Sequence, residues 1–311
     1  MKIISEQQVH QCLNFDKVIN ALKKGFAKPA GTPTRQVFEL SENENNHDAF
    51  AVLPAWNDEV VGVKSFTYFP SNSDHGYKSL YSKIMLFNRA HGEPLALVDG
   101  TSVTLWRTAA VSALASQYLS RVDSKHLIFF GSGNLSTYMI DAHISVRNIK
   151  KVTIIARNND KAQSLKSSMK SKYPNIEFSV GKSDEDTIRS ADIISCGTGS
   201  HTPLFDGNWL SEGTHIDLIG NHHKQFRECD TKSVIRSKVF VDSKKNVLNE
   251  AGELLIPIAE GVFSEQQVVA ELSQFHELEM RRSNDDITLF KSVGTALSDL
   301  LTANLVFKSQ L

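Results

Sequence analysis

Hydrophobic and polar positions change their rhythm once along the chain, and the first part reads as a helix followed by a sheet. Ser5 to Gln8 has the S-x-x-Q form of a capping box, and apolar residues follow at roughly helical spacing as far as Leu22. Short apolar runs separated by turn residues then predict an antiparallel sheet. These runs are Ala49 to Leu53, Val60 to Phe69, Lys83 to Phe87 and Leu95 to Val98. The alanine-rich stretch from Thr104 to Leu119, which lacks Gly and Pro, predicts a helix.

After residue 120, short strand-like runs alternate with helical stretches. The predicted strands are Leu127 to Phe130, Val152 to Ala156, Ile176 to Val180, Ile193 to Cys196, Ile216 to Ile219 and Val239 to Val241. Such alternation indicates a parallel sheet with crossover connections. We therefore predict an α/β fold with two domains, 1–120 and 121–289, and a boundary near Ser120 to Ser124. A second S-x-x-Q box beginning at Ser264 predicts a late helix.

Composition agrees with two globular domains and adds a small partner to the picture. The 311 residues are 41% hydrophobic and 22% charged, as in ordinary soluble proteins. The 34 Lys and Arg balance 35 Asp and Glu, so the basic excess typical of nucleic-acid binding is missing. No apolar run has the length of a signal peptide core or a membrane helix, and we expect a cytoplasmic protein. Three scattered cysteines without a CxxC pair argue against disulfides and structural zinc.

A glycine turn between the strand that ends at Phe130 and the helix after it indicates a dinucleotide site. The turn reads G-x-G-x-x-S, and its two glycines permit a tight bend and close approach of the backbone to a pyrophosphate. An ordinary strand-to-helix turn is the alternative. The candidate cofactor residues in it are Gly131, Ser132, Gly133, Asn134 and Leu135. Thr198, which follows the end of a later strand, is a further candidate.

The end of the next strand bears on the choice of dinucleotide. NAD sites usually place a carboxylate there, whereas an Arg accommodates the 2′-phosphate of NADP. Here Arg157 and Asn158 follow the strand, and no acidic residue occurs before Asp160. We therefore expect NADPH to be preferred, with NADH possible. The alternative is that Arg157 only caps a surface loop.

Three basic residues of the first half lie in unusual surroundings. Arg35 follows a proline-rich loop, Lys64 lies inside a strand-like apolar run, and Arg107 lies on the alanine-rich helix. A charge in apolar surroundings is costly unless an anion pairs with it. Together the three would form a clamp for a small carboxylate, while each alone could be a snorkelling side chain or part of a structural ion pair. Sequence spacing does not show whether they converge.

Five segments resemble the ornithine cyclodeaminase and mu-crystallin family over nearly the whole chain. They are VGVKSF in the 60–66 region, GEPLALVDG at 92–100, LWRTAAVSALA at 105–115, FGSGN at 130–134 and LFKSVGTALSDL at 289–300. The resemblance implies a mixed α+β domain for substrate binding and dimerisation, together with a Rossmann-type domain that binds NAD(P). It also implies a homodimer in which residues 290–311 of each chain pack back onto the first domain.

The resemblance assigns roles to several residues. Arg35, Lys64 and Arg107 match the family's carboxylate-binding Arg, Lys and Arg. Lys64 is the candidate acid, although a purely electrostatic role in the clamp is equally compatible. Val293 and Gly294, in the SVGTA segment, are expected to approach the nicotinamide. Thr108 follows Arg107 at the domain junction and is expected near the cofactor, with helix packing as the alternative.

One position separates the activities found in the family. Ornithine cyclodeaminases carry a catalytic Asp shortly after a GTH segment, and the matching place here holds His222, which we keep as a substrate-binding candidate. Later segments, including HIDLIGN at 215–221, resemble the branch that reduces Δ1-pyrroline-2-carboxylate to L-proline, some members of which also reduce Δ1-piperideine-2-carboxylate to L-pipecolate. The alternatives are an ornithine cyclodeaminase, an alanine-type dehydrogenase and a non-enzymatic crystallin-like binding protein. No metal is expected at His222 and His223, because neighbouring side chains on an extended segment face opposite ways.

Overall fold

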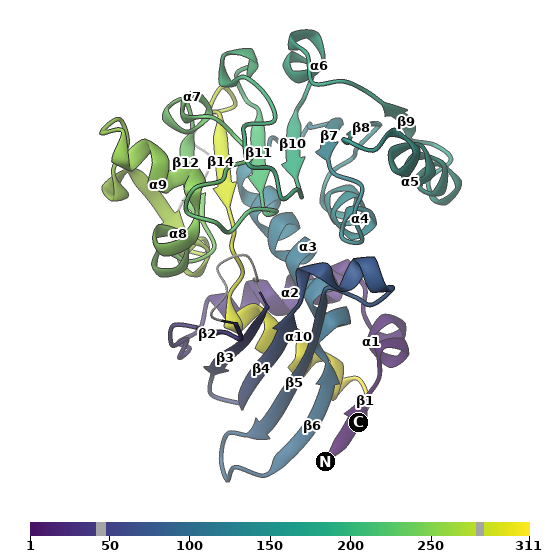
Figure 1. The fold of residues 1–311 in the computed structure, drawn as a ribbon, viewed down its shortest axis with the longest axis vertical. Helices are drawn as coiled ribbons and strands as arrows, with labels where there is room; N and C mark the ends of the chain where they lie inside the picture. The colour runs from purple at the N-terminus through teal and green to yellow at the C-terminus, as the bar shows by residue number, and fades with distance from the viewer. Residues whose placement is uncertain (42–47, 278–282) are drawn as a thin grey trace. The chain divides into compact units, whose positions relative to one another are not determined.

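The computed structural model describes residues 1–41, 48–277 and 283–311, which form two compact units (Figure 1). Unit 1 comprises Met1–Thr108 and Thr295–Leu311, and unit 2 comprises Ala109–Gly294. The first break lies inside helix α3 (Gly100–Leu119), whereas the sequence places a boundary after that helix. A helix that continues through the break carries no turn residue there, so the sequence offers no local sign of it.

Unit 1 is built on a six-stranded sheet with the order β1-β6-β5-β4-β3-β2. Its strands are β1 (Lys2–Ile4), β2 (Gln36–Glu39), β3 (Ala49–Trp56), β4 (Val60–Tyr68), β5 (Leu80–Asn88) and β6 (Pro94–Asp99). Strands β2 to β6 pair antiparallel, as predicted, and β1 adds to the edge in parallel with β6. The four apolar runs of the sequence therefore correspond to the four central and longest strands.

The helices of unit 1 come from both ends of its sequence. They are α1 (Glu6–Cys12), α2 (Phe15–Phe26), the 3-10 helix η1 (Pro70–His75), the first part of α3 and α10 (Ala296–Lys308). The capping box at Ser5 is confirmed, but the helical run after it is two helices and not one. Asn14 interrupts the run because its side chain accepts a hydrogen bond from the Lys17 amide and starts α2 afresh.

The two faces of the unit 1 sheet are unlike. Helix α10 packs against β3, β4 and β5, and on this covered face Leu53 and Leu86 are at most 6% exposed. Gly62 leaves room there for Leu300, because a Cβ at Gly62 would lie 2.6 Å from a Leu300 methyl group. The other face, which we call the open face, carries a register row of Phe38, Phe50, Thr67 and Tyr81. Two members of that row, Phe38 and Tyr81, are 48% and 46% exposed.

Unit 2 is built on an eight-stranded sheet in which every neighbouring pair is parallel. Its strands are β7 (His126–Phe130), β8 (Lys151–Ile155), β9 (Glu177–Val180), β10 (Ile193–Cys196), β11 (His215–Leu218), β12 (Lys238–Val241), β13 (Val268–Glu271) and β14 (Thr288–Lys291). The spatial order β9-β8-β7-β10-β11 is the 3-2-1-4-5 order of a Rossmann fold. The predicted α/β fold class is therefore confirmed, and the strand order reverses between β7 and β10.

Short helices connect the strands of unit 2. They are α4 (Ser136–Val146), α5 (Asn159–Lys172), α6 (Glu185–Arg189), α7 (Thr231–Ile235), α8 (Lys244–Glu250) and α9 (Gly252–Ala259), with 3-10 turns η2 (Gly207–Trp209), η3 (Glu265–Gln267) and η4 (Leu272–Gln274). The late helix predicted at Ser264 is wrong. Its capping box is present but closes only the turn η3, because the β-branched Val268 and Val269 that follow enter strand β13 beside β12.

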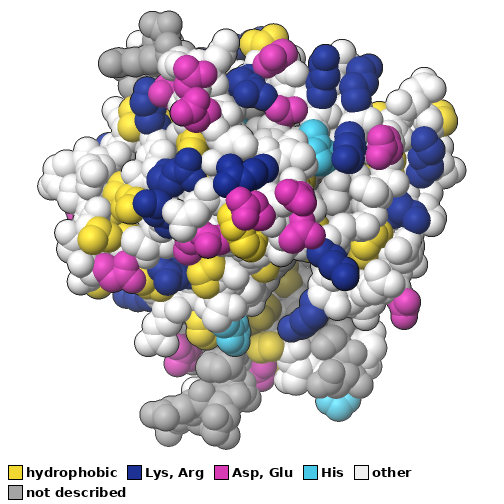
Figure 2. Space-filling view, turned by 90° about the horizontal axis from the view of Figure 1, so that it is seen from above, with side chains coloured by type: hydrophobic (Ala, Val, Ile, Leu, Met, Phe, Trp, Pro, Cys, Tyr) yellow, Lys and Arg dark blue, Asp and Glu magenta, His cyan; other side chains and the backbone are white. Residues whose placement is uncertain are grey.

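The surface seen in Figure 2 carries Lys and Arg side chains interspersed with Asp and Glu, with hydrophobic side chains scattered between them. This mixture agrees with the formal net charge of −1. Within residues 1–41, 48–277 and 283–311, no helix combines the length and the apolar character needed to cross a membrane.

Candidate active site

A cluster of buried charges lies on the covered face of the unit 1 sheet. Lys64, on β4, is 4% exposed, and its ammonium group donates to Thr104 Oγ1 at 2.6 Å and to Asp299 Oδ1 at 3.1 Å. Arg107, on α3, donates from Nε to the same Asp299 oxygen at 3.0 Å. Strand β4 and helices α3 and α10 therefore converge on one carboxylate.

Asp299 is a member of this cluster that the sequence analysis did not identify. Its cationic partners lie 192 and 235 positions away along the chain. An acidic residue in the first turn of a helix, as Asp299 is in α10, is also an ordinary stabiliser of the helix dipole. Its second oxygen, Oδ2, is buried and has no hydrogen-bond partner among the described residues. The only signal in the sequence was its place in the LFKSVGTALSDL segment.

The pKa values reflect this crowding of charge. Burial lowers the pKa of Lys64 to about 8; Asp299 opposes the shift, and the cations Arg107 and Arg35 reinforce it. Burial alone would raise the pKa of Asp299, but Arg107 and Lys64 hold it below its ordinary value. Lys64 is therefore mostly charged at neutral pH and loses its proton in mildly alkaline solution, while Asp299 stays ionised.

Arg35 is the third of the basic residues that the sequence analysis proposed as a carboxylate clamp. It immediately precedes β2, is half-buried, and lies close enough for its charge to affect Lys64. Lys64 and Arg107 thus share Asp299, and Arg35 lies near enough for its charge to lower the pKa of Lys64. Guanidinium and ammonium groups gathered in this way are chemically suited to a small anion. Thr108, one residue beyond Arg107, is half-buried at the end of this part of unit 1.

The glycine turn of unit 2 is tightly bent and fixed to the strand beside it. Gly131 has φ +136°, and its amide donates to Ile155 O at 2.9 Å, so the turn is anchored to the end of β8. A Cβ at Gly131 would lie 3.0 Å from Gly197 O, which makes a side chain there strained as well as crowded. Ser136, in the place of the third glycine, is buried at the start of α4 and is small enough to pack there.

Arg157 and Asn158 follow the end of β8. The Asn158 side chain accepts a hydrogen bond from the Lys161 amide at 2.9 Å and caps α5. Arg157 is exposed beside it and, in the part of the chain that the structure describes, has no ion-pair partner. The helix cap therefore belongs to Asn158, and the loop-capping alternative for Arg157 has no support in these contacts.

The remaining candidates lie in loops that follow strands of unit 2. Thr198, after β10, donates to Glu228 from its amide at 2.7 Å and from its hydroxyl at 2.9 Å. The amides of Val293 and Gly294, after β14, donate to Asp242 Oδ2 at 3.2 and 2.7 Å. His222, after β11, is exposed and belongs to unit 2.

The expectation that His222 and His223 face opposite ways is wrong. Their rings stack with centroids 5.3 Å apart, because the segment is an irregular loop and not an extended strand. Within the described ranges, no group of three or more His, Cys, Asp or Glu side chains is placed to hold a metal ion.

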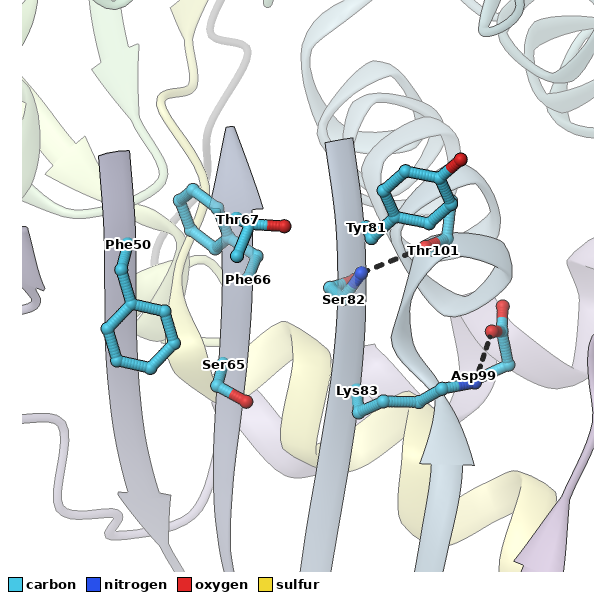
Figure 3. Close-up of a pocket in the computed structure, with 9 residues that line it drawn as sticks. All are labelled: Phe50, Ser65, Phe66, Thr67, Tyr81, Ser82, Lys83, Asp99 and Thr101. Carbon is cyan, nitrogen blue, oxygen red and sulfur yellow. Dashed lines mark hydrogen bonds and ion pairs between the residues drawn. The ribbon is translucent and has the colours of Figure 1, made fainter. Parts of the chain in front are cut away.

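A separate cavity of about 210 Å³ lies on the open face of the unit 1 sheet (Figure 3). It is lined by Phe50, Ser65, Phe66, Thr67, Tyr81, Ser82, Lys83, Asp99 and Thr101. The one ion pair in its wall joins Lys83 to Asp99 at 2.8 Å. Because Ser65 points to the opposite side of β4 from Lys64, this cavity is distinct from the buried cluster.

Comparison with known proteins extends over the whole chain. The sequence profile of the Ornithine cyclodeaminase/mu-crystallin family matches residues 1–311. The Δ1-pyrroline-2-carboxylate reductase of Colwellia psychrerythraea is 56% identical over 310 residues, which cover 98% of each chain.

Solved structures give the same result. Thermococcus litoralis Δ1-pyrroline-2-carboxylate reductase, in complex with NADH and L-proline, matches with a TM-score of 0.93 and 33% identity, covering 99% of this chain and 97% of that one. An archaeal alanine dehydrogenase dimer with bound NAD matches with a TM-score of 0.92 and 26% identity, covering 99% and 95%. The resemblance found in the sequence is therefore confirmed, and the chain belongs to the ornithine cyclodeaminase/mu-crystallin family.

Proposed function

We propose that this chain is an NAD(P)H-dependent imino acid reductase that converts Δ1-pyrroline-2-carboxylate to L-proline. Δ1-Piperideine-2-carboxylate, which gives L-pipecolate, is the proposed six-membered alternative substrate. The observation that carries the proposal is the buried cluster in which Lys64 and Arg107 share Asp299, with Arg35 near Lys64. The 56% identical relative named as a Δ1-pyrroline-2-carboxylate reductase, and the T. litoralis relative solved with L-proline, support the same substrate class.

In this proposal the unit 1 cluster holds the substrate by its carboxylate. Guanidinium groups bind carboxylates through paired, charge-assisted hydrogen bonds, which suits Arg35 and Arg107 to the task. Holding the imine in one orientation is itself worth about 7–11 kcal/mol of the barrier when the reacting atoms are aligned.

Reduction of the C=N bond also requires a proton on the ring nitrogen. Lys64 is the proposed donor, because its lowered pKa of about 8 leaves it protonated at neutral pH yet able to release the proton. In this step the proton passes from Nζ to nitrogen, and the neutral lysine then regains a proton from water. A purely electrostatic role for Lys64 in the clamp is the alternative.

The residues of unit 2 fit a dinucleotide. A Cβ at Gly133 would have no atom of the described residues within 4 Å, so the turn leaves open space above its backbone. Helix α4 begins without a side-chain cap from Leu135, so that side chain does not compete with an anion at the helix N-terminus. When bound, NAD(P)H supplies the hydride that C2 of the imine accepts. Besides the turn residues 131–135, the proposed contacts are Thr108, Asn158, Thr198, Val293 and Gly294.

We further propose that NADPH is preferred to NADH. Arg157 is exposed at the end of β8, where a 2′-phosphate would lie, and its guanidinium can pair with that group. The T. litoralis relative was solved with NADH, which is consistent with NADH as a second cofactor. His222 stays a candidate substrate contact from unit 2, and the cytoplasm stays the predicted location.

The open face of the unit 1 sheet is the proposed site of homodimerisation. Its register rows carry apolar side chains, and Ile3 and Trp56 at its margins are 74% and 40% exposed. Contiguous exposed apolar surface of this kind marks an interface. The archaeal alanine dehydrogenase relative was solved as a dimer, which supports the pairing of two copies.

The proposed activity is tested by following NADPH absorbance with the two cyclic imines, with pyruvate plus ammonia, and with ornithine. We expect rapid oxidation with at least one imine, because the carboxylate clamp and the dinucleotide turn are both formed. Pyruvate plus ammonia should be a poor substrate, and ornithine should release no ammonia. The proposal is rejected by an absence of oxidation with both imines, or by release of ammonia from ornithine without added cofactor.

The cofactor preference is tested with Arg157→Ser. A charge-assisted hydrogen bond contributes about 1.5–3 kcal/mol, so kcat/KM for NADPH should fall about 10–100-fold while kcat/KM for NADH changes little. The exposed Arg189, which pairs with Glu185 on α6, offers a matched control, because Arg189→Ser should leave the NADPH/NADH ratio unchanged. An unchanged ratio in Arg157→Ser would show that the residue does not select the phosphate.

The role of Lys64 is tested through the pH profile of kcat/KM. The lysine is charged below its pKa of about 8, so activity should fall as pH rises through that value. Lys64→Arg should lose this step, because a guanidinium stays charged throughout, and should lower activity about tenfold or more through altered geometry. Lys83→Arg, on the open face, should keep the wild-type profile. Titration of the substrate itself is common to all three proteins, so persistence of an identical step in Lys64→Arg would contradict the assignment.

A further inference from the structure

Three neighbouring loops at the carboxyl edge of the unit 2 sheet are joined by buried charges that the proposed reaction does not use. Strands β10, β11 and β14 lie side by side in the sheet, and each is followed by a loop. In parallel α/β sheets, ligands bind outside the carboxyl ends of the strands. The three loops therefore lie at the edge of the sheet where parallel α/β folds bind their ligands.

Glu228 ties the first two loops together. It lies before α7 and is fully buried. Its Oε1 accepts hydrogen bonds from the amide and hydroxyl of Thr198, at 2.7 and 2.9 Å, and its Oε2 accepts from the Gly220 amide at 2.8 Å. One carboxylate thus fixes the backbone after β10 and the backbone after β11 through three donors.

The two loops are also in unusually close contact. A Cβ at Gly220 would lie 2.1 Å from Thr198 N and 2.7 Å from Glu228 Oε1, so only glycine allows this approach. The Asn221 side chain adds a second connection, donating to Ser200 O at 2.7 Å. Because the two loops are packed this closely, loss of the Glu228 hydrogen bonds is expected to shift both of them.

The third strand end joins through Lys291. This residue ends β14, is fully buried, donates to Asn221 O at 2.6 Å and lies 3.1 Å from Glu253 Oε1. The same Glu253 oxygen accepts from the Glu228 amide at 3.1 Å. The polar connection therefore runs from Thr198 through Glu228 and Glu253 to Lys291 and Asn221, around all three loops.

We propose that Glu228 is a positioning residue for the dinucleotide: its ionised carboxylate holds the Thr198 and Gly220–Asn221 loops in the form that binds the nicotinamide half of NAD(P)H. This inference rests on the proposed function, since it assumes that unit 2 binds a dinucleotide. Glu228 itself acts through the loops and not by touching the reacting atoms.

Protonation of Glu228 would remove one of its acceptor sites, so the loops should loosen as pH falls. Burial raises the pKa of Glu228 to about 7; Lys291 on β14 opposes this and Glu253 on α9 adds to it. Burial also keeps the pKa of the nearby Cys196 and Cys229 thiols well above the ordinary value, so these groups stay neutral. The exposed histidines 201, 222 and 223 lie on the same loops, and a matched variant must separate any effect of theirs from that of Glu228.

The test measures the dissociation constant of NADH, which lacks the titrating 2′-phosphate, by fluorescence titration of the full-length protein on both sides of pH 7. Wild type should bind more weakly as pH falls through about 7. Glu228→Gln should bind about tenfold more weakly on the alkaline side, from loss of one hydrogen bond to a charged acceptor, and should lose the Glu228 part of the pH dependence. The histidines are common to both proteins, so the difference between the two curves isolates Glu228.

Asp230→Asn is the matched control on the same loop. Asp230 caps α7 and accepts from the Gly207 amide, away from the strand ends, so its loss should lower the melting temperature and leave NADH affinity unchanged. If Glu228→Gln does not fold, Glu253→Gln serves instead: removing that neighbouring negative charge should move the pH step to a lower value. A Glu228→Gln protein that melts earlier but binds NADH with wild-type affinity and pH dependence overturns this inference alone. Failure of wild type to bind any dinucleotide overturns the proposed function and the inference with it.

Discussion

The ion cluster of unit 1 is the interaction on which that unit depends. Lys64 and Arg107 are removed from water, and buried charges persist only where opposite charge and hydrogen bonds replace their hydration. Asp299 serves both cations, and it can do so because the C-terminal helix α10 returns to the sheet that contains β4. Breaking a buried ion pair typically costs about 3–5 kcal/mol. Packing of the C-terminal segment onto the sheet of unit 1 and compensation of the buried Lys64 and Arg107 charges therefore depend on each other.

The two units use buried charge in opposite ways. Unit 1 buries Lys64 beside Arg107 and Asp299, and burial, reinforced by the charges of Arg107 and Arg35, lowers the pKa of Lys64. Unit 2 buries two carboxylates, Glu228 and Glu253, with one ammonium group, Lys291, so this cluster has more acidic than basic groups. Because the folded-state pKa of Glu228 is raised, its stabilising contribution is present at acid pH and is lost as pH rises through about 7. The ionised form that orders the strand-end loops therefore comes at a cost in folding stability.

Features coded by neighbouring residues could be predicted from the sequence, and features made by distant residues could not. Short apolar runs between turn residues predicted the antiparallel sheet, strand-like runs alternating with helical stretches predicted the parallel one, and the glycine turn at Gly131 was visible as a motif. Local motifs predicted less well where two conformations compete. Asn14 starts a new helix inside a continuous helical pattern, and the capping box at Ser264 closes only a 3-10 turn before a strand. Glu228 gave no sign of its contacts, and Asp299 gave only its place in the LFKSVGTALSDL segment. Their partners come from other parts of the chain, and their burial depends on the finished fold.

The central claim is that the unit 1 cluster recognises a carboxylate beside a ring nitrogen. Calorimetric titration with L-proline and with pyrrolidine, which is the same ring without the carboxylate, tests it most directly. The account predicts that the wild-type protein binds L-proline and not pyrrolidine. It also predicts that Arg107→Ala loses most of the affinity for L-proline while its affinity for NADPH is kept. Equal binding of the two rings, or unchanged binding of L-proline by Arg107→Ala, would contradict it.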